Sequence, residues 1–425
     1  MKAISGCRSY SFSDDVVITG LGAVCSLGNS IEEIAERFLS GESGVREITD
    51  FDTGGLSPLA AQVKNPPAIK TDIHPELARS MGKHLSLLLA STEEAFCSAR
   101  IGSGMFDPQD IGFFAGMGMV DYRIEDLLSA ALKSMNRDGS PDYDRFFAVG
   151  YQEIYPLWPL GMLNNVAFCQ ASIHFGVRGE NCVFSPHGDA GIQAVAEAVK
   201  VLEDGKAKVA LAGGVSEEIS LHSLARARLH GLIGPPEKKE VLESGAEIFL
   251  GECGAMLVLE PLSSARERGA GMLARVAGFG FACGKDRRTG FVSRQTISSA
   301  IRGALRHAAL GPDRIDLVMT GGLSQNELEA VREIFGGGAE PPILVTVAKT
   351  MGEMFAAGPI LSTAVGLSIA DLSALPLDPP ISVLHPRTVV RGRLPSSVHR
   401  ILVNGISYEG RCASMIVEKT SGETV

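Results

Sequence analysis

The residues best suited to covalent chemistry lie around one turn, where a short apolar run ends and a helical pattern begins. This segment, residues 181–191, reads NCVFSPHGDAG. A cysteine or serine close to a histidine and an aspartate is a residue set for nucleophilic acyl transfer, in which a base removes the proton of the nucleophile. Cys182 and Ser185 are the candidate nucleophiles, and His187 and Asp189 are the candidate acid/base pair.

The spacing argues against each of these candidates. Cys182 lies inside the apolar run, six positions before Gly188, so a small core residue is the simpler interpretation. Side chains on either side of a tight turn need not face each other, and Asp189 is well suited to the start of a helix. Neither Ser185 nor Ser324 has a credible histidine partner in the sequence. An enzyme that uses Cys182 or a serine for acyl transfer or thioester hydrolysis is therefore an alternative hypothesis.

An alternation of apolar runs and helical patterns positions this turn. Apolar runs ending in glycine alternate with amphipathic stretches such as residues 192–202, a pattern typical of stacked α/β units. We predict two successive α/β halves, residues 1–262 and 263–425, with both faces of the sheets covered. The glycines of residues 20–22 lack dinucleotide-loop spacing and more simply close a strand onto a helix. Strands are expected at residues 16–22, 111–116, 209–214, 255–260, 274–280, 315–320, 343–347, 381–384, 401–404 and 414–418.

The composition limits the function classes. The 425 residues carry 39 basic and 49 acidic side chains, and this net charge of −10 argues against nucleic-acid binding, which needs a basic face. Eight cysteines without a CxxC pair or Cys/His metal spacing predict buried, reduced thiols in a cytoplasmic protein, and no metal site. The most apolar stretch, residues 356–377, contains Ser362, Thr363 and Asp371, which predicts a buried helix and no membrane span.

Four segments carry a family resemblance: residues 16–29 (VVITGLGAVCSLGN), 38–45 (FLSGESGV), 171–179 (ASIHFGVRG) and 251–260 (GECGAMLVLE). In this order and spacing they resemble the β-ketoacyl-acyl-carrier-protein synthase (ketosynthase) family, and the resemblance covers almost the whole chain. It implies a thiolase-like α/β fold, in which two similar halves form five layers, α-β-α-β-α. It also implies a dimer that pairs through the strand leading to the turn at Gly188.

The resemblance also identifies what is missing. A ketosynthase needs a cysteine nucleophile at the start of a helix and two histidines that stabilise the charge formed on decarboxylation. These positions fall on Gly188, Gly321 and Glu353, where glycine has no nucleophile and a carboxylate would repel negative charge. We therefore expect no catalytic residues. The candidates for a vestigial pocket are His187, Asp189, Ser324, Lys349 and Tyr408, the last at the position of the family's gating Phe.

The resemblance further implies a role for a silent homologue. In type II polyketide and aryl-polyene systems, an active ketosynthase pairs with an inactive chain-length factor. We predict such a subunit in polyketide or fatty-acid-like elongation, with an active ketosynthase and an acyl carrier protein as partners. We expect this chain to bind no cofactor of its own, and the resemblance implies that the partner acyl carrier protein brings its phosphopantetheine. A non-catalytic scaffold homodimer is the third functional hypothesis. The candidates for a tunnel or partner interface, or alternatively for ordinary core, are Met117, Met119, Tyr122, Cys182 and Phe184.

Overall fold

The first part of the chain, up to residue 261, alternates strands and helices as predicted. The computed structural model describes residues 14–69, 82–122, 124–156, 158–184, 186–233, 248–287, 289–322, 324–337, 342–371 and 398–420. The strands of this first part are β1 (Val16–Cys25), β2 (Arg46–Glu47), β3 (Leu59–Ala60), β4 (Ile111–Met117), β5 (Asn181–Phe184), β6 (Val209–Val215) and β7 (Cys253–Pro261). Its helices are α1 (Ile31–Leu39), α3 (Gly82–Ser98), η1 (Pro108–Asp110), α4 (Ile124–Lys133), α5 (Tyr143–Ala148), η2 (Gly150–Glu153), η3 (Trp158–Met162), α6 (Asn164–Phe175), α7 (Ala190–Glu203) and α8 (Leu221–Leu229).

The second part repeats the alternation. Its strands are β8 (Ala274–Cys283), β9 (Leu317–Met319), β10 (Ile343–Val345), β11 (Arg400–Ile406) and β12 (Arg411–Lys419). Its helices are α10 (Leu262–Glu267), α11 (Arg294–His307), η4 (Pro312–Arg314), α12 (Gln325–Phe335), α13 (Ala348–Met351) and α14 (Gly358–Asp371). The expected strands are confirmed with shifted ends, except that residues 381–384 lie outside the described part of the chain.

The strand order is the same in both parts. The first five long strands lie in the order β5-β4-β6-β7-β1, and the second five in the order β10-β9-β11-β12-β8. In each part the second strand along the chain pairs parallel with both of its neighbours, which are β5 and β6 for β4, and β10 and β11 for β9. Val17 and Ile18 of β1 also pair with Arg275 and Ala274 of β8, so these strands form one ten-stranded sheet. The predicted boundary at residue 262 falls at the start of α10 and stays a prediction.

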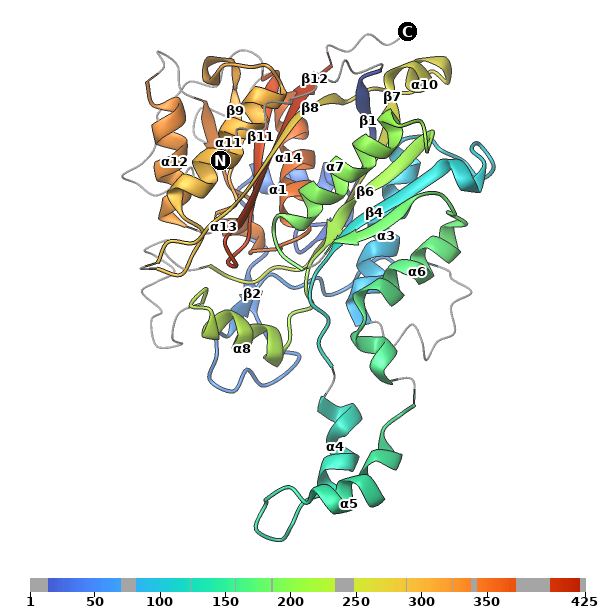
Figure 1. Ribbon diagram of the computed structural model, residues 1–425, viewed down its shortest axis with the longest axis vertical. Coiled ribbons are helices and arrows are strands. Elements are labelled where there is room, and N and C mark those ends of the chain that lie inside the picture. Colours follow the sequence, from blue (N-terminus) through green and yellow to red (C-terminus); the bar gives the residue numbers. More distant parts are fainter. Residues whose placement is uncertain are drawn as a thin grey trace, which may run out of the picture.

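Helices cover the strands in three layers (Figure 1). On one outer side α3 and α6 pack on the strands of the first part, and on the other α11 packs on β8 and β12 with α12 beside it. Between them, α7 and α14 each contact strands of both parts. The chain therefore has the predicted thiolase-like α/β fold with its α-β-α-β-α layers.

Two glycines of β1 allow the strand to approach α3 closely. A Cβ at Gly20 would lie 2.5 Å from the carbonyl oxygen of Ala95, and a Cβ at Gly22 would lie 2.1 Å from that of Ser91. Any larger residue would push the helix away from the strand. The prediction that these glycines end the strand at a helix is therefore wrong: they lie within β1, which continues to Cys25, and they allow it to pack closely on α3.

The apolar stretch at residues 356–377 is partly described and forms α14. Its side chains Ile360, Leu361 and Val365 are completely buried in the central layer, which confirms the prediction of a core helix. None of the described helices is long and apolar enough to cross a bilayer. The prediction of buried thiols is wrong for Cys97, Cys169 and Cys283, which are free and exposed. These three cysteines occur late in α3, in α6 and at the end of β8.

Candidate functional site

Gly188, Gly321 and Glu353 line one small cavity, although they lie far apart in the sequence. Gly188 belongs to the turn before α7, Gly321 follows β9, and Glu353 follows α13. The cavity has a volume of about 20 Å³. That is room for about one water molecule and far less than a small-molecule substrate needs.

At Gly188, the backbone of another segment occupies the place of a side chain. A Cβ at Gly188 would lie 2.3 Å from the carbonyl oxygen of Ile406. The reverse contact is equally close, because a Cβ at Gly405 would lie 2.3 Å from the carbonyl oxygen of Gly188. The side chain of Ile406 also covers Gly321, where a Cβ would lie 3.2 Å from its Cγ1. The end of β11 therefore fills the space that reactive side chains would need.

Glu353 is a buried carboxyl group on the wall of this cavity. Its Oε1 accepts a hydrogen bond from the backbone N–H of Phe355 at 2.8 Å. Burial raises the pKa of Glu353 to about 8, and the negative charge of Glu327 adds to this rise. At neutral pH the group is therefore predominantly protonated and neutral. The repulsion expected from a carboxylate at this position is thus largely removed by protonation.

A second buried carboxyl group, Glu327 of α12, organises the backbone beside the cavity. It accepts hydrogen bonds from the N–H groups of Gly321 at 2.9 Å and Gly322 at 3.0 Å, and from Nδ2 of Asn404 at 2.9 Å. Burial raises the pKa of Glu327, and these three donors oppose the rise. Glu327 thereby holds the turn after β9 against β11.

A polar cluster connects the turn before α7 with the loop between β11 and β12. His187 Nε2 lies 3.1 Å from a carboxylate oxygen of Glu409, and Arg411 Nε lies 3.2 Å from Asp189 Oδ2. The His187 ring packs edge-on against Tyr408 at 4.4 Å between centroids. Burial lowers the pKa of His187, although the charge of Glu409 opposes this. These contacts use His187 and Asp189 to secure the loop, and they do not bring the two side chains to a nucleophile.

Comparisons with known proteins agree with this fold. A sequence model of the family described as "Beta-ketoacyl synthase, N-terminal domain" matches residues 13–265. The chain belongs to the β-ketoacyl synthase family. It is 28% identical over 369 residues to the tetracenomycin polyketide synthase ketoacyl synthase beta subunit of Streptomyces glaucescens, covering 84% of this chain and 86% of that protein.

One further relative and one solved structure are also similar to this chain. The chain is 26% identical over 380 residues to 3-oxoacyl-[acyl-carrier-protein] synthase 2 of Coxiella burnetii, covering 85% of this chain and 87% of that protein. Among solved structures, the ishigamide ketosynthase/chain length factor superposes with a TM-score of 0.75 at 21% identity, covering 96% of this chain and 100% of that one. The similarity to this solved structure shows a shared fold.

The alternative nucleophiles of this β-ketoacyl synthase family member lack an activating environment. Cys182 is half-buried on β5, where burial and the charge of Glu197 raise the pKa of its thiol and disfavour the thiolate. Ser324 precedes α12, and its hydroxyl has no hydrogen-bond partner in the described ranges. Lys349 is half-buried in α13, where burial lowers its pKa, and it does not line the small cavity. Ser185 lies outside the described residues.

The five tunnel or interface candidates separate into two groups. Met117 is completely buried in the core, as expected for the alternative interpretation of an ordinary core residue. Met119 and Tyr122 are exposed just beyond β4. Cys182 and Phe184 lie on β5, the last strand of the sheet. Cys182 and Phe184 are partly buried against the core, and the interface assignment of these last four residues stays a prediction.

The sequence did not identify the residues that close the site. Ile406 reaches Gly188 and Gly321 through its backbone and side chain, and no local pattern predicts that contact. For Glu327 a signal existed, since Ser324 and Glu327 have the spacing of a helix capping box. The carboxyl group instead binds the N–H groups of Gly321 and Gly322.

Proposed function

We propose that this chain is a catalytically silent subunit that pairs with an active β-ketoacyl synthase in type II polyketide or fatty-acid-like chain elongation. The contact between Gly188 and the carbonyl oxygen of Ile406 carries the proposal, because it leaves no space for a nucleophile. Removing a nucleophile typically lowers turnover on the order of 10⁶-fold. Similarity to a ketoacyl synthase beta subunit supports a paired role.

An apolar surface beside an open sheet edge supports pairing. β5 ends the sheet, and among the described residues it pairs with β4 alone, so its outer edge offers backbone groups that another chain could pair with. Thirteen of the seventeen exposed large hydrophobic side chains in the described ranges lie between residues 119 and 173. Within this segment α4 and α5 extend away from the sheets (Figure 1). Apolar surfaces of this kind mark protein–protein interfaces.

An acyl carrier protein is the second proposed partner. Its phosphopantetheine arm would deliver the growing chain to the active subunit, because the small cavity here holds about one water molecule. On this proposal the silent subunit binds no cofactor and contributes surface to the shared assembly.

Intact-protein mass spectrometry tests the proposal. The purified chain is incubated with acyl- and malonyl-carrier protein, alone and co-expressed with a ketosynthase, while malonyl decarboxylation is monitored. We expect the chain alone to keep its mass and leave malonyl groups intact, and the complex to be acylated on the partner only. A stoichiometric adduct on the chain alone would establish a relocated enzyme. Failure to co-purify with any ketosynthase would favour a scaffold homodimer.

Charged substitutions on the α4–α5 surface should weaken the complex. Leu132 and Phe147 are 62% and 69% exposed, so Leu132→Asp and Phe147→Asp should leave the fold intact and each reduce partner affinity about tenfold or more. Leu229→Asp is the matched control, because Leu229 is 87% exposed on α8. Analytical ultracentrifugation measures the affinity. Unchanged affinity in both surface variants would place the interface elsewhere.

A further inference from the structure

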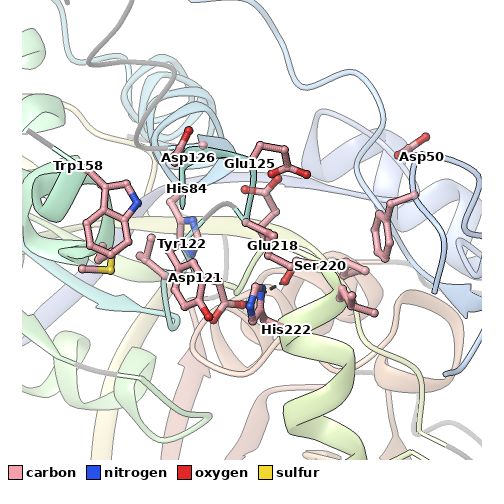
Figure 2. A pocket seen from close by; sticks show the side chains of 18 of the residues that line it. Asp50, His84, Asp121, Tyr122, Glu125, Asp126, Trp158, Glu218, Ser220 and His222 are labelled. Atoms are coloured by element: carbon pink, nitrogen blue, oxygen red, sulfur yellow. Dashed lines mark hydrogen bonds between the residues drawn. The ribbon is translucent and has the colours of Figure 1, made fainter. Parts of the chain in front are cut away.

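A second, larger cavity lies at the base of the α4–α5 extension and shares no lining residue with the small cavity. It has a volume of about 780 Å³ and lies between the segment that starts α4, the η3 turn and the start of α8 (Figure 2). Residues 50–52 form a further side. This is the size of a small-molecule binding site.

The lining of this cavity is strongly acidic. None of the described residues that line it is Lys or Arg. Among its carboxylates, Asp50 pairs with Lys64 at 2.7 Å and Asp121 pairs with Arg226 at 2.8 Å. The other four have no Lys or Arg partner within 4.0 Å in the described ranges; they are Asp52, Glu125, Asp126 and Glu218. The cavity therefore favours a positively charged occupant and disfavours an apolar acyl chain, which would desolvate these groups.

Aromatic rings share the wall with the carboxylates. Tyr122 packs against Trp158 at 6.1 Å and against His222 at 4.6 Å between ring centroids. Phe51 and Tyr155 also line the cavity. Ring faces beside carboxylates attract organic ammonium groups, because the ring quadrupole adds to the charge interaction. A bare metal ion would make no use of these rings.

His84 supplies a buried hydrogen-bond acceptor at the same place. It is 2% exposed and lines the cavity, and Figure 2 shows it between Trp158 and Glu218. Its Nε2 lies 3.1 Å from the carbonyl oxygen of Met119, which can only accept, so Nε2 carries the proton. Burial lowers the pKa of His84, which favours the neutral ring, although Glu218, the hydrogen bond to Met119 and Asp121 oppose this shift. Its Nδ1 is then an acceptor, and it has no partner in the described part of the chain.

We propose that this cavity binds a small organic ammonium ion, a protonated amine on an apolar body. The carboxylates supply the attraction for the charge, and Tyr122 and Trp158 contact the apolar body. This inference goes beyond the proposed silent-subunit role and does not depend on it.

Isothermal titration calorimetry on the full chain at pH 7 tests this proposal. Hexylamine is the cationic probe, and hexanoate and 1-hexanol are the anionic and neutral compounds of similar size. We expect hexylamine to bind at least about tenfold more tightly than either isostere, and its affinity to fall as salt is added. Equal binding of all three probes, or no binding of hexylamine, would overturn the proposal.

Two sets of variants test whether hexylamine binds in this cavity or elsewhere on the surface. Glu218→Gln combined with Asp126→Asn should weaken hexylamine about tenfold or more, with an unchanged melting temperature. Asp144→Asn is the matched control, because Asp144 is an exposed carboxylate on α5 that does not line the cavity. Equal effects of the control and the double variant would contradict the site.

A final titration uses the complex with a co-expressed ketosynthase. Retained hexylamine binding supports a free amine as the ligand. Loss of binding on complex formation would overturn the small-molecule assignment, because the partner would then fill or close the cavity. The acylation assay on the same samples reports the silent-subunit role separately.

Discussion

Glu353→Gln is expected to stabilise the protein at alkaline pH by on the order of 5 kcal/mol, with little effect at pH 4. Burial raises the pKa of Glu353 from 4.5 to about 8. Between these values the native state holds a proton that the unfolded state has released. The free energy of unfolding therefore falls as pH rises through this window, and the loss is complete above pH 8. Gln keeps the acceptor for the N–H of Phe355 and does not titrate.

Urea unfolding at pH 4, 7 and 9 measures this effect. The difference in the free energy of unfolding between the variant and the parent should be near zero at pH 4 and increase toward pH 9. Burial also raises the pKa of Glu327, so the ionisation of this group lowers the free energy of unfolding as pH rises. Because Glu327 is present in both proteins, this effect is common to the variant and the parent. Glu47→Gln, an exposed carboxylate substitution, is the control and should follow the parent. Parallel pH profiles for Glu353→Gln and the parent would contradict the burial of an uncharged carboxyl group.

Gly188→Cys is expected to destabilise the protein by about 1–3 kcal/mol and to restore no ketosynthase activity. The new Cβ would lie 2.3 Å from the carbonyl oxygen of Ile406, so the end of β11 must shift. Such a shift would also disturb Gly405, whose backbone contacts the same turn. The two family histidines would still be absent, since Gly321 and Glu353 occupy their positions.

Gly271→Cys provides the matched control, because a Cβ there meets no atom within 4 Å. Thermal unfolding should show a lower melting temperature for Gly188→Cys and an almost unchanged melting temperature for Gly271→Cys. Incubation with acyl-carrier protein, followed by intact mass measurement, should show no acyl adduct on either variant. A stable Gly188→Cys protein that is acylated stoichiometrically would show that the site is open, which would remove the observation on which the silent-subunit proposal rests.

Local patterns were sufficient for most of the secondary structure. Apolar runs ending in glycine predicted strands such as β4 and β6, because a strand buried on both faces reads as a continuous apolar run. The family resemblance added the layer arrangement. The pairing of Val17 and Ile18 with β8 was not predicted, since it depends on two strands that are distant in the chain.

The residue types alone establish that no cysteine stands at position 188 and no histidine at 321 or 353, because folding cannot supply a side chain that the chain does not encode. Only the tertiary structure shows that Ile406 fills the emptied space and that Glu353 is buried there. It likewise places the unpartnered Nδ1 of His84 among carboxylates and aromatic rings from separate segments. Such contacts, and the pKa shifts that they cause, depend on packing between residues that are far apart in sequence.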